Sequence, residues 1–162
     1  MMNSSGETDT PVNFDKLRFL VVDDFENFRN SMWQMLRSLG ADRIEPVHNG
    51  SVAIQRCAYE HFDVILCNYN LGEGKSGQHV LEELRHRKLL RHSSLFLMVT
   101  AETSREMVMG AREYHPDAYL TKPINQAMLT KRLGALAERR QALLPITRAM
   151  DLEDYPEAIQ QC

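Results

Sequence analysis

The architecture of the chain can be traced outward from one stretch, Arg18-Phe19-Leu20-Val21-Val22-Asp23-Asp24. Its first five residues form a short, mostly apolar and β-branched run, which is typical of a strand buried on both faces of a sheet. Two adjacent carboxylates end the run. Over residues 25–39 apolar residues then recur at helical spacing, and Gly40 ends the pattern. The sequence therefore predicts a buried strand that leads directly into an amphipathic helix.

The same alternation of strand and helix repeats along the rest of the chain. We expect further strands at 43–47, 63–67, 95–99 and 118–120, and further helices at 51–60, 78–90, 104–114 and 125–143. Strands that alternate with helices through short loops form a parallel sheet with right-handed crossovers. These units predict an α/β protein with a flavodoxin-like, doubly wound five-stranded parallel sheet, strand order 2-1-3-4-5, with helices on both faces.

Three segments are expected along the chain. Residues 1–16 are polar and predict a disordered N-terminal lead, and residues 17–143 hold the α/β domain. Residues 144–162 form a C-terminal extension, in which the acidic stretch 151–159 has the pattern of another amphipathic helix. We expect this extension to be the start of a truncated second domain, and a natural end of the chain is the alternative.

The composition is that of a soluble globular protein. The chain has 162 residues, of which 43% are hydrophobic and 25% charged, and its formal net charge is −3. The charge argues against nucleic-acid binding by this chain, and no apolar run is long enough to cross a membrane. The three cysteines show no C-x-x-C spacing, which suits a reducing compartment. We therefore expect a cytoplasmic protein that binds neither nucleic acid nor membrane.

Polar residues follow four of the predicted strands, where ligands bind in doubly wound sheets. They are Asp23 and Asp24 after the first strand, Asn68 and Asn70 after the third, Thr100 after the fourth and Lys122 after the fifth. Adjacent carboxylates repel each other unless a cation or a hydrogen-bonded cap compensates, and Mg²⁺ prefers oxygen ligands. Capping of the next helix is the simpler explanation for the two acids. The lysine expected at the same edge favours a binding site.

The residues at these strand ends resemble the signature of the response-regulator receiver domain. The resemblance covers roughly residues 16–140 and rests on Val21-Val22-Asp23-Asp24, Ile65-Leu66-Cys67-Asn68-Tyr69-Asn70, Val99-Thr100-Ala101 and Tyr119-Leu120-Thr121-Lys122-Pro123. It implies a module of a two-component phosphorelay that takes phosphate from a histidine kinase or phosphotransfer protein. It also implies a downstream protein partner, bound through the 104–114 helix, the fifth strand and the last helix. Such a module is not an enzyme beyond its own phosphotransfer and dephosphorylation.

The same resemblance implies a role for each residue at the edge. Asp23, Asp24, Asn68 and Asn70 would hold Mg²⁺, Thr100 and Lys122 would contact the phosphoryl group, Thr100 and Tyr119 would form the conformational switch, and Ala101 and Glu102 would control access to the phosphate. The Lys122–Pro123 peptide bond resembles one that is cis in the family.

Position 68 departs from the family pattern, because Asn68 stands where the family has its phospho-acceptor aspartate. A carboxylate is an anionic nucleophile, whereas an amide is neutral and its nitrogen lone pair is delocalised. We therefore expect a form that cannot be phosphorylated at this position and that binds Mg²⁺ weakly.

Two explanations for Asn68 remain open. An engineered Asp-to-Asn form is favoured, because the rest of the signature is complete and degenerate receivers tend to lose several of its residues together. The alternative is a natural pseudo-receiver that acts as a phosphorylation-independent adaptor. An aspartyl phosphatase is disfavoured, because that class needs an Asp-x-Asp pair and here the two acids are adjacent.

Overall fold

The computed structural model describes residues 12–101 and 114–154. Its elements are η1 (Phe14–Lys16), β1 (Arg18–Val22), α2 (Glu26–Ser38), β2 (Arg43–Val47), α3 (Gly50–Tyr59), β3 (Val64–Asn68), α4 (Gly77–His86), β4 (Leu95–Thr100), β5 (Ala118–Thr121) and α6 (Gln126–Asp154). The helix predicted at 104–114 lies, apart from its last residue, outside the described residues. The strands and the other helices lie close to their predicted ranges, except for the ends of α4 and α6. Helix α4 was expected to reach Leu90 but ends at His86, because Lys88 has a φ of +56°, which a helix cannot continue through.

The five strands form one sheet with the order β2-β1-β3-β4-β5, and every neighbouring pair is parallel. The predicted flavodoxin-like topology is therefore confirmed. Val22 at the end of β1 is in register with Cys67 of β3, and Asn68 is in register with Val99 of β4. The carboxyl ends of these central strands consequently meet at one edge of the sheet.

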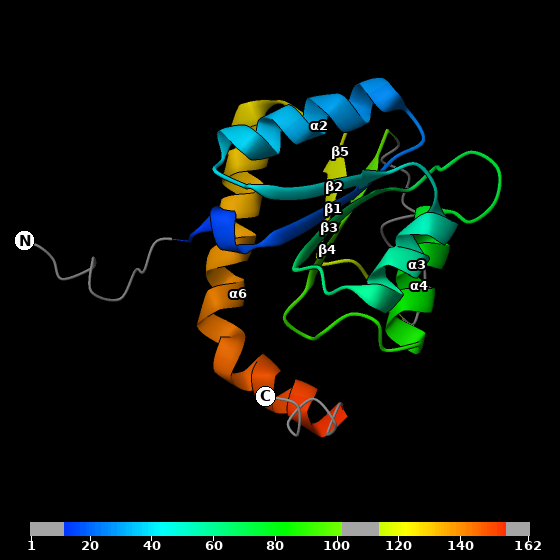
Figure 1. Ribbon diagram of the computed structural model, residues 1–162. Helices are drawn as coiled ribbons and strands as arrows, with labels where there is room; N and C mark the ends of the chain where they lie inside the picture. Colours follow the sequence, from blue (N-terminus) through cyan, green and yellow to red (C-terminus); the bar gives the residue numbers. More distant parts are fainter. Residues whose placement is uncertain (1–11, 102–113, 155–162) are drawn as a thin grey trace, which may run out of the picture.

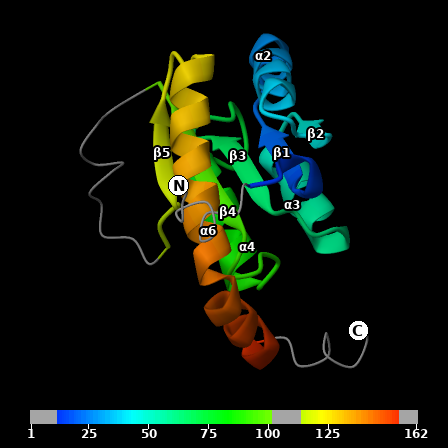
Figure 2. The same cartoon turned by 90° about the vertical axis from the view of Figure 1, so that its left-hand side faces the viewer.

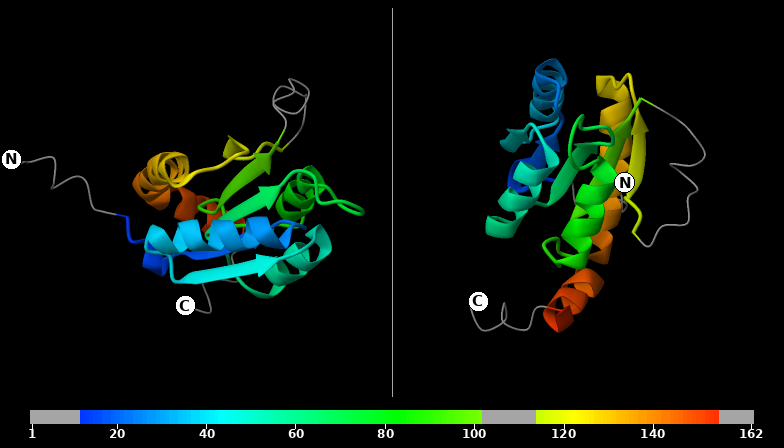
Figure 3. Two further views of the ribbon diagram at one scale, coloured as in Figure 1. Left: turned by 90° about the horizontal axis from the view of Figure 1, so that it is seen from above. Right: turned by 90° about the vertical axis from the view of Figure 1, so that its right-hand side faces the viewer.

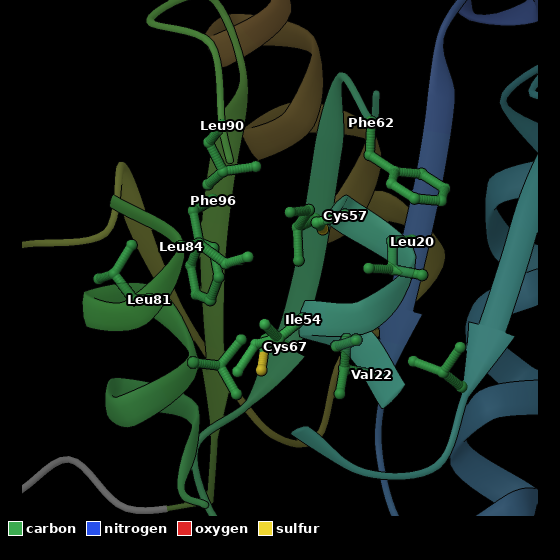
Figure 4. Close-up of a cluster of buried hydrophobic side chains, with 14 of the residues drawn as sticks. Leu20, Val22, Ile54, Cys57, Phe62, Cys67, Leu81, Leu84, Leu90 and Phe96 are labelled. Carbon is green, nitrogen blue, oxygen red and sulfur yellow. The ribbon is translucent and has the colours of Figure 1, made fainter. Parts of the chain in front are cut away.

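Two layers of helices cover the sheet, with α2 and α6 on one face and α3 and α4 on the other (Figure 1). Successive residues of a strand point to opposite faces, so that Leu20 packs toward α3 and α4 while Phe19 packs toward α2 and α6. Figure 4 shows the first of these clusters, in which Ile54 of α3 and Leu84 of α4 lie over the strands. Both faces of the sheet are therefore buried, as the apolar strands predict.

The start of α4 brings its backbone unusually close to β3. Ser76 caps the helix, because its side chain accepts a hydrogen bond from the backbone N–H of His79. A Cβ atom on the next residue, Gly77, would lie 2.5 Å from the backbone oxygen of Asn68 and 2.8 Å from the sulfur of Met98. Only glycine fits at this position, and its close approach fixes the loop that follows Asn68.

Helix α6 was expected to end near residue 143, and this prediction was wrong. The helix runs for 29 residues to Asp154 and passes through Pro145 (Figure 2). Proline removes one backbone hydrogen bond, which favours a helix end. Two contacts with the domain compensate: Arg140 donates to the backbone oxygen of Ser93 at 2.9 Å, and Asp151 accepts from the backbone N–H of His92 at 2.8 Å. Tertiary contacts thus override the local signal.

The lead was expected to be disordered as far as residue 16, and this prediction was wrong for its last residues. Residues 1–11 lie outside the described part. Phe14–Lys16 forms one 3-10 turn, and Val12 and Phe14 pack against the core between the sheet and α2 and α6. The Phe14 and Phe19 rings are 6.4 Å apart. Because the lead is mostly polar, the sequence analysis did not predict that these two apolar residues pack against the core.

No helix within residues 12–101 and 114–154 combines the length and the apolar character that a membrane span requires.

Candidate functional site

Four strands deliver polar side chains to the carboxyl edge of the sheet. Asp23 follows β1, Asn68 ends β3, Thr100 ends β4 and Lys122 follows β5. Asp23 is 0% exposed, Thr100 5% and Asn68 8%, so that three polar groups are buried at this edge. Buried polar groups need hydrogen-bond partners or a ligand, and their partners therefore decide what the site can do.

Asp23 is a buried carboxylate held from two sides. Its Oδ1 accepts a 2.8 Å hydrogen bond from the backbone N–H of Phe25, and its Oδ2 lies 3.3 Å from Nζ of Lys122. Burial raises the pKa of Asp23, and the hydrogen bond from Phe25 and the charge of Lys122 offset this only in part. A further cation at this edge would stabilise the ionised form of Asp23.

Lys122 connects the fifth strand to the first. Its ammonium group contacts Asp23 and also lies 4.0 Å from the centre of the Phe28 ring, a cation–π contact. Its backbone N–H donates to the oxygen of Thr100 at 2.8 Å. The Lys122–Pro123 peptide bond is cis, which confirms the expectation drawn from the resemblance. Lys122 is therefore positioned at the edge with its charge partly satisfied.

The side-chain nitrogen of Asn68 is bound by the residue's own loop. Its side-chain Nδ2 donates a 2.7 Å hydrogen bond to the backbone oxygen of Asn70. The side chain of Asn70 in turn accepts from the backbone N–H of Gly72 at 3.1 Å. The loop that follows β3 is thus folded back on the residue that ends the strand.

Four other residues were predicted at this site, namely Asp24, Tyr119, Ala101 and Glu102. Asp24 is exposed, and a Cβ atom on Gly72, whose φ is +75°, would lie 3.3 Å from its Oδ2. Tyr119 is half-buried and packs against the cluster under α3 and α4. Ala101 is exposed immediately after β4, and Glu102 lies outside the described residues.

The sequence analysis missed two residues of the site, Phe28 and Arg29 on α2. Phe28 was assigned only to the apolar face of its helix, yet its ring makes a cation–π contact with the ammonium group of Lys122. The guanidinium group of Arg29 donates to the backbone oxygen of Asp23 at 2.7 Å. Both lie within the first turns of the helix that follows the two acids, and this proximity was the available signal.

The donors at this edge suit a hard divalent cation. They are the carboxylates of Asp23 and Asp24 together with amide and carbonyl oxygens of Asn68 and Asn70, which are the ligand types that Mg²⁺ accepts. In the described ranges, however, no cluster of three or more acidic, histidine or cysteine side chains forms a metal site. The ends of strands β1 and β3 offer two carboxylates at this edge, those of Asp23 and Asp24.

Comparison with known proteins identifies the family. The profile of the response regulator receiver domain matches residues 19–134. The chain belongs to this family. Receiver domains are signalling modules, and this receiver domain is 30% identical over 123 residues to the chemotaxis protein CheY-3 of Vibrio cholerae, a match that covers 76% of this chain and 93% of CheY-3. It is 28% identical over 123 residues to CheY of Pseudomonas aeruginosa, covering 76% of this chain and 98% of that protein.

Solved structures agree with this assignment. Chemotaxis response regulator CheY4 of Vibrio cholerae superposes with a TM-score of 0.66 at 26% identity, over 74% of this chain and 98% of CheY4. Response regulator TrrA of Thermotoga maritima, in complex with Mg²⁺ and BeF, superposes with a TM-score of 0.64 at 25% identity, over 74% of this chain and 98% of TrrA. This receiver domain therefore shares the fold of both proteins.

Proposed function

We propose that this chain is the silent form of a two-component receiver whose aspartate parent accepts a phosphoryl group at position 68 from a histidine kinase or phosphotransfer protein. The observation that carries this proposal is the 3.3 Å contact between Nζ of Lys122 and the buried carboxylate of Asp23, at the edge of the sheet where position 68 ends β3. An aspartate there would place a nucleophilic oxygen beside a cationic group, whereas the amide supplies no nucleophile.

Lys122 and Thr100 would hold the phosphoryl group of the parent form. Phosphoryl transfer depends on positioning and on neutralising the charge of the equatorial oxygens. Lys122 can supply positive charge from its present position near Asp23, and the hydroxyl of Thr100, at the end of β4, would hydrogen-bond an oxygen. Ala101 leaves room for the group, and Glu102 and Asn70 would tune the access of water.

Mg²⁺ would be held by the carboxylates of Asp23 and Asp24, the backbone oxygen of Asn70 and the side chain at position 68. When bound, the ion would supply positive charge to the phosphoryl oxygens. The complex of TrrA with Mg²⁺ and BeF supports this assignment. In the present form the Asn70 oxygen already accepts the Asn68 amide, and the site lacks one carboxylate, so that we expect weaker metal binding.

The output of the parent form would be a change at a protein-binding face. Tyr119, half-buried on β5, and Thr100 at the end of β4 would act as the switch. The face would comprise residues 104–114, β5 and α6, and it would bind a downstream protein in the cytoplasm rather than nucleic acid or membrane. With Asn68 in place, the switch would stay in its unphosphorylated state.

The second candidate is a natural pseudo-receiver that binds its partner without phosphorylation. The observation in its favour is that buried Asn68 is well accommodated, since its amide group has a short hydrogen bond to Asn70. The completeness of the other site residues favours the first candidate instead.

One experiment separates the two candidates. Asn68→Asp is incubated with Mg²⁺ and acetyl phosphate, and acid-labile phosphate is measured. Incorporation of phosphate supports a phosphate-accepting parent. If Asn68→Asp binds Mg²⁺ but gains no phosphate, the site has lost its chemistry and the adaptor is the better description.

A further inference from the structure

A pocket lies at the end of the molecule opposite to Asp23 and Lys122. It has a volume of about 570 Å³ and is formed where the C-terminal ends of α3 and α4 meet the last turns of α6. Figure 2 and the right-hand view of Figure 3 show these last turns, in red, below the sheet. Its cationic and larger apolar lining residues are Tyr59, Lys88, Leu89, Arg91, Arg148 and Leu152. The pocket exists because α6 continues past Pro145.

The pocket gathers more positive than negative charge. Lys88, Arg91 and Arg148 line it from two separate parts of the chain. The two acids of its wall are already engaged, since Glu60 pairs with Arg56 at 2.8 Å and Asp151 with His92 at 2.8 Å. Within residues 12–101 and 114–154, no carboxylate lies within ion-pair distance of Arg91 or Arg148. An anion would find two guanidinium groups ready to bind it.

The backbone of Lys88 is strained. Its φ is +56°, and it follows the end of α4, where the N–H of Leu89 donates to the oxygen of Leu84 at 2.8 Å. Glycine is the residue that such a helix end favours, because it has no Cβ atom. A lysine here gives up that advantage and brings a positive charge to the pocket wall. Strain of this kind is concentrated at functional positions.

The rest of the lining is apolar and includes an exposed aromatic ring. Tyr59 is 78% exposed at the end of α3, and Leu152 is 47% exposed on α6. Leu89 contributes a further apolar wall. Pockets that bind small molecules have volumes of roughly 300–1,000 Å³ and combine apolar walls with a few polar groups that orient the ligand. The exposed ring and the cations together fit a flat ligand that carries a negative charge.

We propose that this pocket binds a small aromatic anion, an aromatic ring that bears a phosphate or carboxylate group. The anionic group is held by Arg91, Arg148 and Lys88, and the ring lies against Tyr59, Leu89 and Leu152. The site is independent of position 68 and of the metal, since it lies at the other end of the strands.

The test is an NMR titration of the full chain in buffer with a chelator. The probes are AMP as an aromatic phosphate and 4-hydroxyphenylacetate as an aromatic carboxylate, with adenosine and inorganic phosphate as the separated halves. We expect at least one aromatic anion to saturate, with shifts at Tyr59, Leu89 and Arg148. That anion should bind at least about tenfold more tightly than adenosine or inorganic phosphate, since ring and charge act together.

Variants test each part of the site. Arg91→Gln and Arg148→Gln should each weaken binding by about fivefold or more, since each removes a charge-assisted hydrogen bond. Arg87→Gln and Arg139→Gln are the matched controls on the same segments, outside this pocket, and should leave the affinity unchanged. Lys88→Gly should weaken binding without lowering the melting temperature, because glycine relieves the positive φ.

Three results overturn the proposal. The first is that neither aromatic anion binds below about 10 mM, the range of negligible affinity. The second is that the arginine variants and their controls bind equally well. The third is that binding is seen only after residues 155–162 are deleted, which would make that segment of the chain the occupant of the pocket.

Discussion

The side-chain amide of Asn68 donates a 2.7 Å hydrogen bond to the backbone oxygen of Asn70. An aspartate at this position has no hydrogen to donate when it is ionised, so that its oxygen would face another oxygen. An asparagine in place of an aspartate here would therefore both remove a nucleophile and supply a hydrogen bond that holds the loop after β3. Phosphate chemistry, metal affinity and stability should all depend on this relationship.

The chain should be chemically silent toward phosphodonors. Incubated with Mg²⁺ and acetyl phosphate, it should gain no acid-labile phosphate, whereas Asn68→Asp should, because only a carboxylate at this position is a nucleophile. Phosphate is measured by intact mass before and after acid treatment. Stable phosphate on the Asn68 protein would show that the acceptor is a different side chain.

Mg²⁺ should bind more weakly to the Asn68 chain than to Asn68→Asp. The variant adds one negative charge to the two acids, and it frees the oxygen of Asn70 from the amide. Isothermal titration of both proteins at the same ionic strength gives the comparison. Glu26→Gln, which removes a charge from the start of α2, controls for net charge. Equal affinities for the Asn68 chain and for Asn68→Asp would mean that position 68 does not contact the ion.

Asn68→Asp should strengthen Mg²⁺ binding but lower the free energy of unfolding in metal-free buffer. Without metal, the Asn68 chain should be more stable than Asn68→Asp by about 1 to 2 kcal/mol, the size of one unfavourable charge interaction. The free energy of unfolding is measured by denaturant melts with Mg²⁺ and with chelator. Millimolar Mg²⁺ should narrow the difference, because it binds the three-acid form more tightly. A more stable aspartate form in chelator would contradict the clustering of acids at this edge.

The sequence predicted the carboxyl edge of the sheet better than the opposite edge. Asp23, Asn68, Thr100 and Lys122 are tied to strand ends, and parallel strands bring such ends together regardless of detail. The ring of Phe28 under Lys122 escaped prediction, because an apolar residue on a helix face is assigned to the core by its spacing. Residues that act through one specific contact leave no periodic signal.

Ionisation of Asp63 should make the free energy of unfolding depend on pH. Burial by itself raises its pKa, but the hydrogen bond from His61, the backbone N–H of Arg18 and the charge of Arg140 outweigh it, and the pKa is lowered. A lowered pKa contributes stability above the ordinary value of 3.8, and that contribution is lost as the pH falls through the folded-state pKa. Asp63→Asn should therefore cost about 1 to 3 kcal/mol at neutral pH, typical of a broken buried charged pair.

The measurement for Asp63 is a pair of denaturant melts at neutral pH and near pH 3, where the acid is largely protonated in the unfolded chain. The cost of Asp63→Asn should shrink at the lower pH. Asp42→Asn, which removes an exposed partner of Arg37, is the control and should have little effect at either pH. A cost that is the same at both pH values would mean that the charge of Asp63 is not what stabilises the fold.

Asp151 should hold the last turns of α6 against the domain. Its carboxylate accepts from the backbone N–H and lies 2.8 Å from the ring nitrogen of His92. Asp151→Ala should speed amide hydrogen exchange over residues 144–154, since Pro145 has already weakened the helix there. Glu153→Ala, an exposed neighbour, is the matched control. Unchanged exchange in Asp151→Ala would mean that the extension of α6 does not depend on His92.

The extension of α6 also shows where sequence reasoning ends. Pro145 predicts a helix end from local geometry, whereas the bonds from Arg140 to Ser93 and from His92 to Asp151 join residues far apart in sequence. No pattern within a short window reveals such partners. The same holds for the pocket beside Arg148, since it is formed by three segments that only the fold brings together.

Helix α6 is long enough for a small rotation at its start to produce a large displacement further along it. At 1.5 Å per residue, its 29 residues span about 43 Å, from just after Lys122 to the far end of the domain. A tilt of roughly 10° about its first turn would displace residue 144, about 27 Å along the axis and just before Pro145, by about 5 Å, because displacement grows in proportion to distance along a straight helix. The hydrogen bonds that Arg140 and Asp151 make with the domain oppose such a tilt. Loss of these bonds would therefore let a small rotation beside Lys122 produce a large displacement at the other end of α6.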